Sequence, residues 1–175
     1  GISWAPSPDG MSAFSFVDAQ TGLGASASGI FRATDGGTSF ASVLAGEAVA
    51  VTALSSSVAV AIVDGIIFRS SNGGSTWTAG ASASGRNRLL KVSADVVLAY
   101  GRGGTFPDFD DRILRSDDGG QTWIDLGEVI PATAYAADLN FTVLSASIIV
   151  ASDGSGNLYR SIDAGLSWSM SHATP

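Results

Sequence analysis

A nine-residue turn sequence occurs four times in this chain, and its recurrence constrains the fold more than any other feature. In each copy the first position is Arg and the second is Ala or Ser. The fourth position is Asp or Asn, the sixth is Gly, the eighth is Ser or Thr and the ninth is an aromatic residue, while the other positions vary. The copies occupy residues 32–40, 69–77, 115–123 and 160–168. The acidic or amide position falls at Asp35, Asn72, Asp118 and Asp163, which gives intervals of 37, 46 and 45 residues. A period of about 40 residues is typical of proteins that repeat one supersecondary unit.

The residue types within the repeat predict a tight turn between two strands. β-branched, aromatic or leucine residues precede each arginine, as expected of a strand. The Asp or Asn side chain can accept hydrogen bonds from the backbone N–H groups that follow it, and the recurring glycine suits a positive φ. The aromatic ring can pack between neighbouring sheets while an indole N–H finds a backbone partner. The glycines and rings concerned are Gly37, Gly74, Gly120, Gly165, Phe40, Trp77, Trp123 and Trp168.

These turns resemble the Asp-box repeat, also called the BNR repeat, of sialidases, sortilin-type receptors, xyloglucan-cleaving hydrolases and the photosystem II assembly-factor propellers. The resemblance implies that each turn joins the third and fourth strands of a propeller blade. It also implies that the Asp residues are structural and face away from the active or binding end. Asn72 and Phe40 depart from the acid and the tryptophan of the pattern, and both keep the chemistry of the turn.

Four short β-rich runs in each period predict an all-β propeller of four-stranded antiparallel blades. Successive apolar residues at 58–63 and 148–150 predict strands that are buried between adjacent blades on both faces. The first strand of the last blade is expected at 136–140. We expect one propeller segment over residues 1–175, with blades at 7–46, 47–84, 85–130 and 131–175.

The first residues repeat the second half of the turn, because Gly1-Ile2-Ser3-Trp4 matches residues 165–168. The match predicts that residues 1–6 form the last strand of a preceding blade. A blade strand without its sheet exposes unpaired edge groups, so we expect the four blades to belong to a larger ring or to pair with another copy. A closed four-bladed ring with residues 1–6 displaced is the alternative.

Composition excludes several classes of partner. A net charge of −7, with Lys91 as the one lysine, argues against binding a nucleic-acid backbone, which needs clustered cations. No apolar run approaches the roughly 20 residues that span a bilayer. The chain has no cysteine, and no sequence motif calls for a cofactor.

Residues 101–111 form the most distinctive link, since the second blade has only two residues at the equivalent place. Asp108, Asp110 and Asp111 offer oxygen ligands for Ca²⁺, but they lack the spacing of an EF-hand, so a solvated loop is the alternative. Other residues in and near this link stand outside the repeat pattern and are candidates for contact with a partner. These residues are Arg86, Arg88, Arg102, Phe106 and Phe109.

The arginine that opens each repeat is expected to have a structural role. Each of these residues ends a predicted third strand beside its own turn, where a guanidinium can bond turn carbonyls or the acid. The resemblance to the assembly-factor propellers, in which arginines contact a partner protein, keeps a binding role open. The four residues are Arg32, Arg69, Arg115 and Arg160.

The functional prediction is a non-catalytic interaction platform in an extracytoplasmic, lumenal or virion setting. Residues 16–25, with Phe16, Asp18 and Gly22, look like the blade pattern of the photosystem II assembly-factor type. Binding is expected at the loops opposite the repeated turns: residues 9–12, 55–57, 101–111 and 153–156. A protein partner or a second propeller segment is expected, and a glycan is an alternative ligand.

The alternative function is a fragment of a glycan-binding or glycan-hydrolysing propeller whose site other blades complete. Sialidases use an arginine triad and a tyrosine–glutamate pair. Glu47 and Glu128 are the only glutamates, and neither has a recognisable tyrosine partner in the sequence. A paired-carboxylate glycosidase needs two acids at a suitable separation, and the sequence selects no pair.

Overall fold

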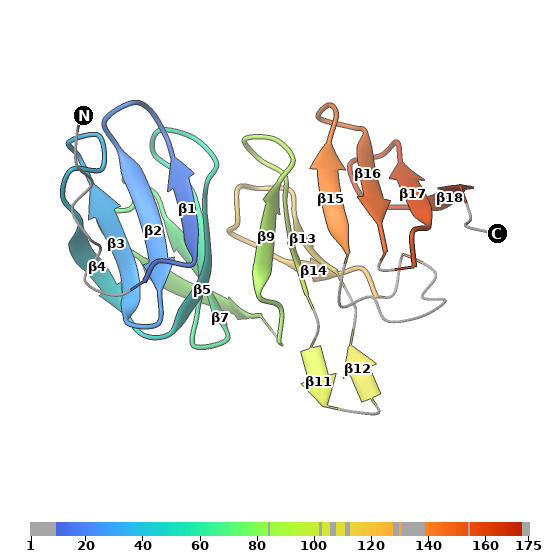
Figure 1. Cartoon of the computed structure of the whole chain (residues 1–175), viewed down its shortest axis with the longest axis horizontal. Helices are drawn as coiled ribbons and strands as arrows, with labels where there is room; N and C mark the ends of the chain where they lie inside the picture. The colour runs from blue at the N-terminus through green and yellow to red at the C-terminus, as the bar shows by residue number, and fades with distance from the viewer. Residues whose placement is uncertain are drawn as a thin grey trace.

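Every regular element that the computed structural model describes is a β-strand. The described residues are 10–83, 85–101, 103–105, 108–110, 113–127, 130, 139–153 and 155–172. They form four antiparallel four-stranded sheets and one two-stranded hairpin (Figure 1). The predicted all-β class and the predicted four-stranded units are therefore confirmed, while residues 1–6 lie outside the described residues.

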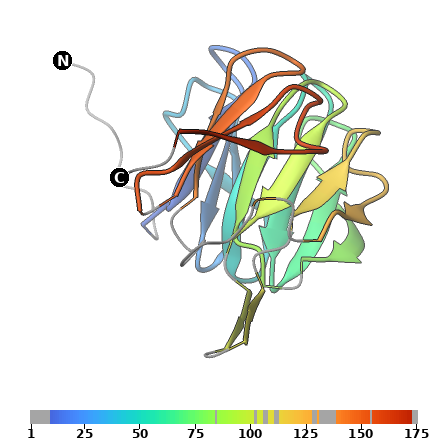
Figure 2. The same ribbon diagram turned by 90° about the vertical axis from the view of Figure 1, so that its right-hand side faces the viewer.

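The sheets follow one another along the chain. The first sheet contains β1 (Ala13–Phe16), β2 (Gly22–Ser26), β3 (Gly29–Ala33) and β4 (Ala41–Ala45), and the second contains β5 (Ala48–Ala53), β6 (Ala59–Val63), β7 (Ile66–Ser70) and β8 (Thr78–Ser82). The third contains β9 (Arg88–Lys91), β10 (Val97–Tyr100), β13 (Leu114–Ser116) and β14 (Ile124–Asp125). The fourth contains β15 (Asn140–Val143), β16 (Ile149–Ser152), β17 (Leu158–Ser161) and β18 (Ser169–His172). The hairpin of β11 (Gly103–Thr105) and β12 (Asp108–Asp110) projects from the third sheet (Figures 1 and 2).

The repeated turns, residues 32–40, 69–77, 115–123 and 160–168, join the third and fourth strands of the four sheets. Each of these repeat turns lies beside the turn between the first two strands of its own sheet, as when Gly73 N donates to Ser57 O at 2.7 Å and Gly119 N donates to Asp95 O at 2.8 Å. The link that carries β11 and β12 leaves β10 at the opposite end of the sheets (Figure 1). Residues 55–57 therefore lie at the same end as the repeat turns, and the prediction that they lie opposite is wrong.

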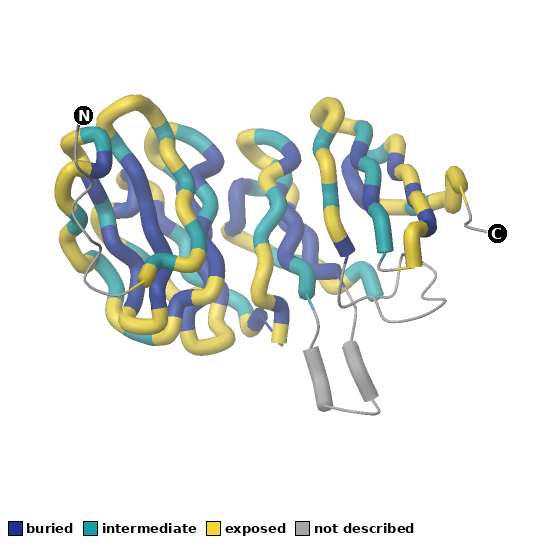
Figure 3. Tube along the Cα trace, in the orientation of Figure 1, coloured by how far each residue is buried: buried dark blue, intermediate teal, exposed yellow. Residues whose placement is uncertain are grey.

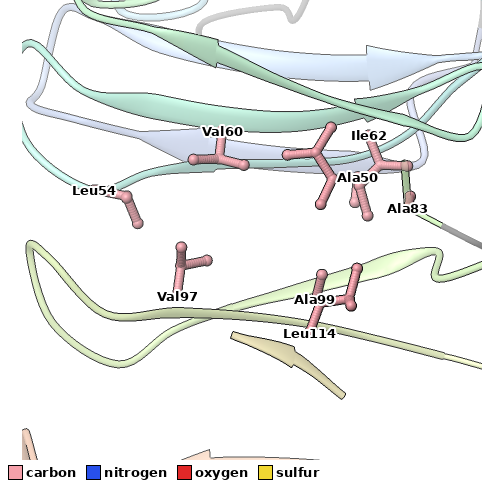
Figure 4. Close-up of a cluster of buried hydrophobic side chains, with 9 residues drawn as sticks. Ala50, Leu54, Val60, Ile62, Ala83, Val97, Ala99 and Leu114 are labelled. Carbon is pink, nitrogen blue, oxygen red and sulfur yellow. The ribbon is translucent and has the colours of Figure 1, made fainter. Parts of the chain in front are cut away.

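Three hydrophobic clusters hold the four sheets together, one between each consecutive pair. Leu23 and Ile30 meet Val51 and Ala61 between the first and second sheets. Side chains of the second and third sheets face each other in Figure 4, and they include Leu54, Val60, Ile62, Val97 and Leu114. Between the third and fourth sheets the cluster includes Leu98, Ile113, Ile149 and Tyr159.

The strand β6 is buried along its whole length, as the apolar run at 58–63 predicts. The strand β2 of the first sheet is likewise buried throughout (Figure 3). The corresponding expectation for residues 148–150 is wrong, because β16 alternates between buried and half-buried residues. Only the face toward the third sheet is covered by the described residues. Apolar composition alone does not distinguish a strand with two neighbours from a strand with one. The strand β15 begins at Asn140, later than the predicted run at 136–140, of which residues 136–138 lie outside the described residues.

A hydrogen bond from the arginine of one repeat turn reaches the turn of the next sheet. Arg32 Nε donates to Gly73 O at 2.8 Å, and Arg69 Nε donates to Gly119 O at 2.8 Å. Arg115 repeats the contact, with its Nη1 donating to the carbonyl of Ala164. The prediction that each arginine serves its own turn is therefore wrong for this bond, although Arg115 Nε also lies 3.0 Å from its neighbour Asp117 Oδ1.

The recurring glycine of each turn forms the second part of this inter-sheet joint. A Cβ added at Gly74 would overlap with Leu23 Cδ2, and a Cβ added at Gly120 lies 2.5 Å from Val60 Cγ2. At Gly165 the nearest atom is Leu98 Cδ1 at 3.0 Å. An apolar side chain from the second strand of one sheet therefore packs against the glycine of the repeat turn in the next sheet. The inter-sheet joint consists of this apolar contact and the hydrogen bond from the arginine.

Candidate functional site

The Asp or Asn side chains of the repeat turns, and the Ser and Thr hydroxyls bonded to them, make their hydrogen bonds within the turns. Asp118 Oδ1 accepts from the backbone N–H of Gln121 and of Thr122, both at 2.9 Å, and Asp118 Oδ2 accepts from Thr122 Oγ1 at 2.6 Å. Ser116 Oγ donates to Asp118 Oδ1 at 2.8 Å and accepts from Gly120 N at 2.8 Å. These bonds close the loop that the sequence predicts.

The other three turns repeat this geometry with small changes of chemistry. Asn72 Oδ1 accepts from Thr76 N at 2.9 Å, and its amide donates to Thr76 Oγ1 at 2.8 Å, so the hydroxyl reverses its role. Asp163 and Asp35 each accept from the backbone N–H and the hydroxyl of the residue four positions on. The indoles of Trp77, Trp123 and Trp168 each donate to the carbonyl of the turn glycine, at 3.1 to 3.2 Å. Gly37, Gly74, Gly120 and Gly165 have φ between 83° and 92°, as predicted.

Hydrogen bonding keeps the turn carboxylates ionised. Burial raises the pKa of Asp118, but the bonds from the Thr122 hydroxyl and backbone outweigh burial and hold the pKa at about 2. The same balance holds the pKa of Asp163 at about 2, with Ser167 as the main donor. A carboxylate with a low pKa and satisfied oxygens is a poor proton donor or acceptor near neutral pH. The turns are thus suited to holding the chain together rather than to acid–base chemistry.

A hollow of about 570 Å³ lies over the first strands of the first three sheets. The strand β5 contacts both β1 and β9, so these three strands form its floor, and they are seen side by side in Figure 1. The hollow is lined by Ser12, Ala13, Phe14, Val49, Ala50, Val51, Asn87, Arg88, Leu89 and Tyr100. This is the volume expected of a site for a small ligand or a short peptide segment.

The lining combines exposed apolar surface with a few polar groups. Val49 is 37% exposed, whereas the ring of Phe14 lies on the outer face of the first sheet, where it packs edge to face on Phe40. Arg88 and Asn87 are also exposed, and they supply hydrogen-bond donors at the third-sheet side. Tyr100 is held by an edge-to-face contact with Phe141, with 4.5 Å between the ring centroids. Phe14, Val49, Asn87 and Tyr100 were not identified from the sequence, since nothing in the repeat pattern distinguishes them.

The structure separates the predicted partner-binding arginines. Arg88 lines the hollow, whereas Arg86 is only 2% exposed, so Arg86 has little surface to offer a partner. Arg102 and Phe106 lie outside the described residues, and Phe109 is described only as a backbone position in β12.

Two of the three predicted Ca²⁺ ligands belong to the projecting hairpin. Asp108 and Asp110 belong to β12, while Asp111 lies outside the described residues. Within the part of the chain that the structure describes, no group of three or more His, Cys, Asp or Glu side chains is placed to hold a metal ion. The loop at 153–156 uses Asp153 internally, because its carboxylate accepts from Asn157 N at 2.9 Å and from Tyr159 Oη at 3.0 Å. Among the described residues, no helix is long and apolar enough to cross a membrane.

Comparison with known proteins gives matches of structure but not of sequence. No protein-family model matches the chain, and no curated protein matches it. A YCF48 solved bound to a D1 peptide is similar, with a TM-score of 0.54 and 12% identity over 97% of this chain and 84% of that one. YCF48 from Cyanidioschyzon merolae gives a TM-score of 0.62 and 15% identity over 97% of this chain and 59% of that one.

Two glycoside hydrolases of the GH74 group are also similar. The xyloglucanase from Xanthomonas campestris gives a TM-score of 0.62 and 16% identity over 90% of this chain, and an ancestral GH74 enzyme gives 0.65 and 17% over 96%. This chain spans only 29% and 25% of the length of those two enzymes. At such identities the likeness concerns the fold alone. The chain therefore has a β-propeller fold, of which the described residues form four blades.

Proposed function

We propose that this protein is a non-catalytic interaction platform that binds a polypeptide segment in the hollow over β1, β5 and β9. The observation that carries the proposal is the lining, in which the exposed Val49 side chain lies beside the exposed donors of Arg88 and Asn87. Apolar side chains can take up alternate residues of an extended segment, and the polar groups can bond its carbonyls or an acidic side chain.

The chemistry of the repeat turns supports a structural role for them, and we propose that they are Asp-boxes. Their carboxylate oxygens accept bonds from their own turns, and their arginines reach the next sheet. Such a scaffold holds the first strands in fixed positions. A preorganised surface loses little conformational freedom on binding.

The structural neighbours are compatible with a peptide ligand, since one YCF48 was solved with a D1 peptide. We propose by analogy that the partner here is a protein. The net charge of −7 favours a partner with a positive or neutral contact surface over a nucleic acid. An extracytoplasmic setting stays a prediction from the resemblance of the repeats.

A glycan is the second candidate ligand, and the aromatic residue Tyr100 favours it. Tyr100 is among the residues that line the hollow, and two structural neighbours are GH74 enzymes. Hydrolysis requires a pair of carboxyl groups beside the scissile bond. No Asp or Glu is among the described residues that line this hollow, so a carbohydrate would be bound there rather than cleaved.

A peptide selection tests the proposal without assuming the identity of the partner. A phage library of random peptides is panned on the immobilised chain, and the best peptide is titrated by fluorescence anisotropy. Arg88→Ala should weaken binding by about tenfold, as expected from the loss of one hydrogen bond to a charged group. Lys91→Ala is the matched control, because Lys91 is an exposed cation on the same strand outside the hollow, and it should leave the affinity unchanged.

The same protein is then incubated with xyloglucan oligosaccharides, and both binding and release of reducing ends are measured. The proposal expects no release of reducing ends. A library that yields no binding peptide, or a turnover of xyloglucan, would overturn the peptide-binding proposal in favour of the glycan-directed alternative. Equal affinity of the Arg88→Ala and wild-type proteins for the selected peptide would move the binding site away from the hollow.

A further inference from the structure

The inter-sheet joint has a donor half and an acceptor half, and among the described residues each occurs once without its counterpart. The donor half is an arginine of the third strand with an apolar side chain of the second strand opposite it. The acceptor half is a repeat turn with its glycine and the carbonyl that precedes that glycine. Three joints between the four sheets use three of each half. The fourth sheet keeps a donor half and the first sheet keeps an acceptor half.

The unused donor half is centred on Arg160 and Val150. These residues pair across β16 and β17, as Leu98 and Arg115 pair across β10 and β13. Among the described residues the exposed Arg160 guanidinium has no hydrogen-bond or ion-pair partner, whereas Arg115 is buried in its joint.

The apolar residues around this donor half are exposed where their equivalents are covered. Leu144 is 63% exposed, while Val92, at the same position of the third sheet, is 7% exposed. Leu158 is 37% exposed, while Ile113, which also lies two residues before the arginine, is 1% exposed. The outer face of the fourth sheet thus repeats an interface that is buried elsewhere in the same molecule.

The unused acceptor half is the turn at Asp35–Phe40. No side chain of the described residues donates to the Gly36 carbonyl, although the equivalent carbonyls of Gly73, Gly119 and Ala164 each accept from an arginine. The face beside it is aromatic. Phe14 is 55% exposed and packs edge to face on Phe40 at 6.4 Å between ring centroids.

The equivalent face of the second sheet is covered. Val51 occupies the position of Phe14 in the strand register and is 6% exposed. Trp77 occupies the position of Phe40 and packs on the cluster between the first and second sheets. The first sheet therefore presents, toward solvent, the surface that the second sheet presents to the first.

The two faces lie far apart on the molecule. The first and fourth sheets lie at opposite ends of the long axis of the molecule, so the four sheets form an open row and not a closed four-bladed ring (Figure 1). The donor half of one chain cannot meet the acceptor half of the same chain in this arrangement. Each chain nevertheless offers both halves of a joint that it already forms three times.

We propose that a second copy of this chain docks head to tail, with the outer face of its fourth sheet on the outer face of the first sheet. Arg160 donates to the Gly36 carbonyl of the other copy, and Val150 rests on its Gly37. Because each copy carries one donor half and one acceptor half, two copies form two equivalent joints and close on themselves. The eight sheets of such a pair, four from each copy, lie within the range of known propellers.

Sedimentation velocity of the 175-residue chain across a dilution series tests this proposal. A dimer of twice the 17.6 kDa chain mass is expected at the higher concentrations. Leu144→Glu on the donor half and Phe14→Glu on the acceptor half should each give a monomer, because a carboxylate is then forced against an apolar face. Arg160→Ala should weaken the dimer by about tenfold per joint. Ile124→Glu is the matched control, since Ile124 is 51% exposed on β14, away from both faces, and it should leave the dimer intact.

A mixing experiment distinguishes head-to-tail docking from like-to-like docking. The Leu144→Glu chain retains a good acceptor half and the Phe14→Glu chain retains a good donor half, so their mixture should form a dimer that neither forms alone. Circular dichroism and the unfolding midpoint confirm that each variant is folded. A wild-type chain that stays monomeric at all concentrations would overturn the proposal. A dimer that only one of the two variants disrupts, or a mixture that stays monomeric, would overturn it as well.

Discussion

Substituting Gly120 by alanine should destabilise the protein through a collision between sheets. Gly120 has a φ of 85°, and a Cβ there lies 2.5 Å from Val60 Cγ2. Val60 has no exposed surface, and its strand is paired on both sides, so it has little room to retreat. A positive φ costs alanine roughly 1–2 kcal/mol, and overpacking adds about 1–3 kcal/mol. Alanine also lowers the conformational entropy of the unfolded chain, which stabilises the folded state by about 0.4–1 kcal/mol. The unfolding free energy should therefore fall by roughly 1–5 kcal/mol in total.

Gly119→Ala is the matched control for the backbone contribution. Gly119 has a φ of 68°, and a Cβ there meets nothing closer than 3.6 Å. The unfolding free energy of the Gly119→Ala protein should therefore fall by only roughly 0.5–1 kcal/mol. Both variants are measured by urea unfolding followed by tryptophan fluorescence, and equal m values are required for the comparison. Equal losses in the two variants would refute the close approach of the sheets, as would a failure of Val60→Ala to recover part of the loss in the Gly120→Ala protein.

Three further substitutions or conditions probe the turns. Trp123→Phe removes the bond to the Gly120 carbonyl and should lower the unfolding free energy by about 1–2 kcal/mol, measured by circular dichroism. The folded-state pKa of Asp118, about 2, lies below the ordinary 3.8, so its contribution to stability is present above pH 3.8 and is lost as the pH falls toward 2; acid titration of Asp118→Asn should show a weaker loss than wild type. Ala164 has a φ of 57°, so Ala164→Gly should raise the unfolding free energy by about 0.5–1 kcal/mol, and an unchanged or lower urea midpoint would contradict this strain.

The sequence was sufficient for the turns because each turn is a local structure. The acceptor Asp118 and its donors lie within four residues of one another, so residue types at fixed spacing determine the bonds. The turn at Asn72 was also predictable, although it has an amide in place of the acid. The Asn72 side-chain oxygen accepts from Thr76 N, as a carboxylate would, and its NH₂ group donates to the Thr76 hydroxyl.

The joints between sheets could not be predicted in the same way. Arg69 donates to a residue 50 positions away, and its direction depends on how the second sheet lies on the third. Sequence spacing places Arg69 beside its own turn but does not specify which turn its side chain reaches. The periodic recurrence of an arginine and a glycine was a visible signal, although it does not show that the two belong to neighbouring units.

The hollow was only partly predictable for a related reason. Arg88 stands outside the repeat in the sequence, whereas Val49 is an ordinary strand residue there. Val49 comes near Arg88 only because β5 and β9 lie in contact. Arg86 satisfied the same sequence criterion as Arg88 and is buried. It lies in the turn before β9, where its backbone N–H donates to Ala83 O at 3.0 Å, so the alternation of strand side chains does not determine its direction.

Hydrogen–deuterium exchange of the native chain with and without the peptide selected on it tests the proposed function most directly. Binding in the hollow predicts slower exchange in segments 13–16, 48–53 and 88–91, which carry the first strands of three sheets. Exchange in the repeat turns at 69–77 and 115–123 should not change. Protection that appears at those turns and leaves the three strands unaffected would contradict an interaction platform built on the inner strands.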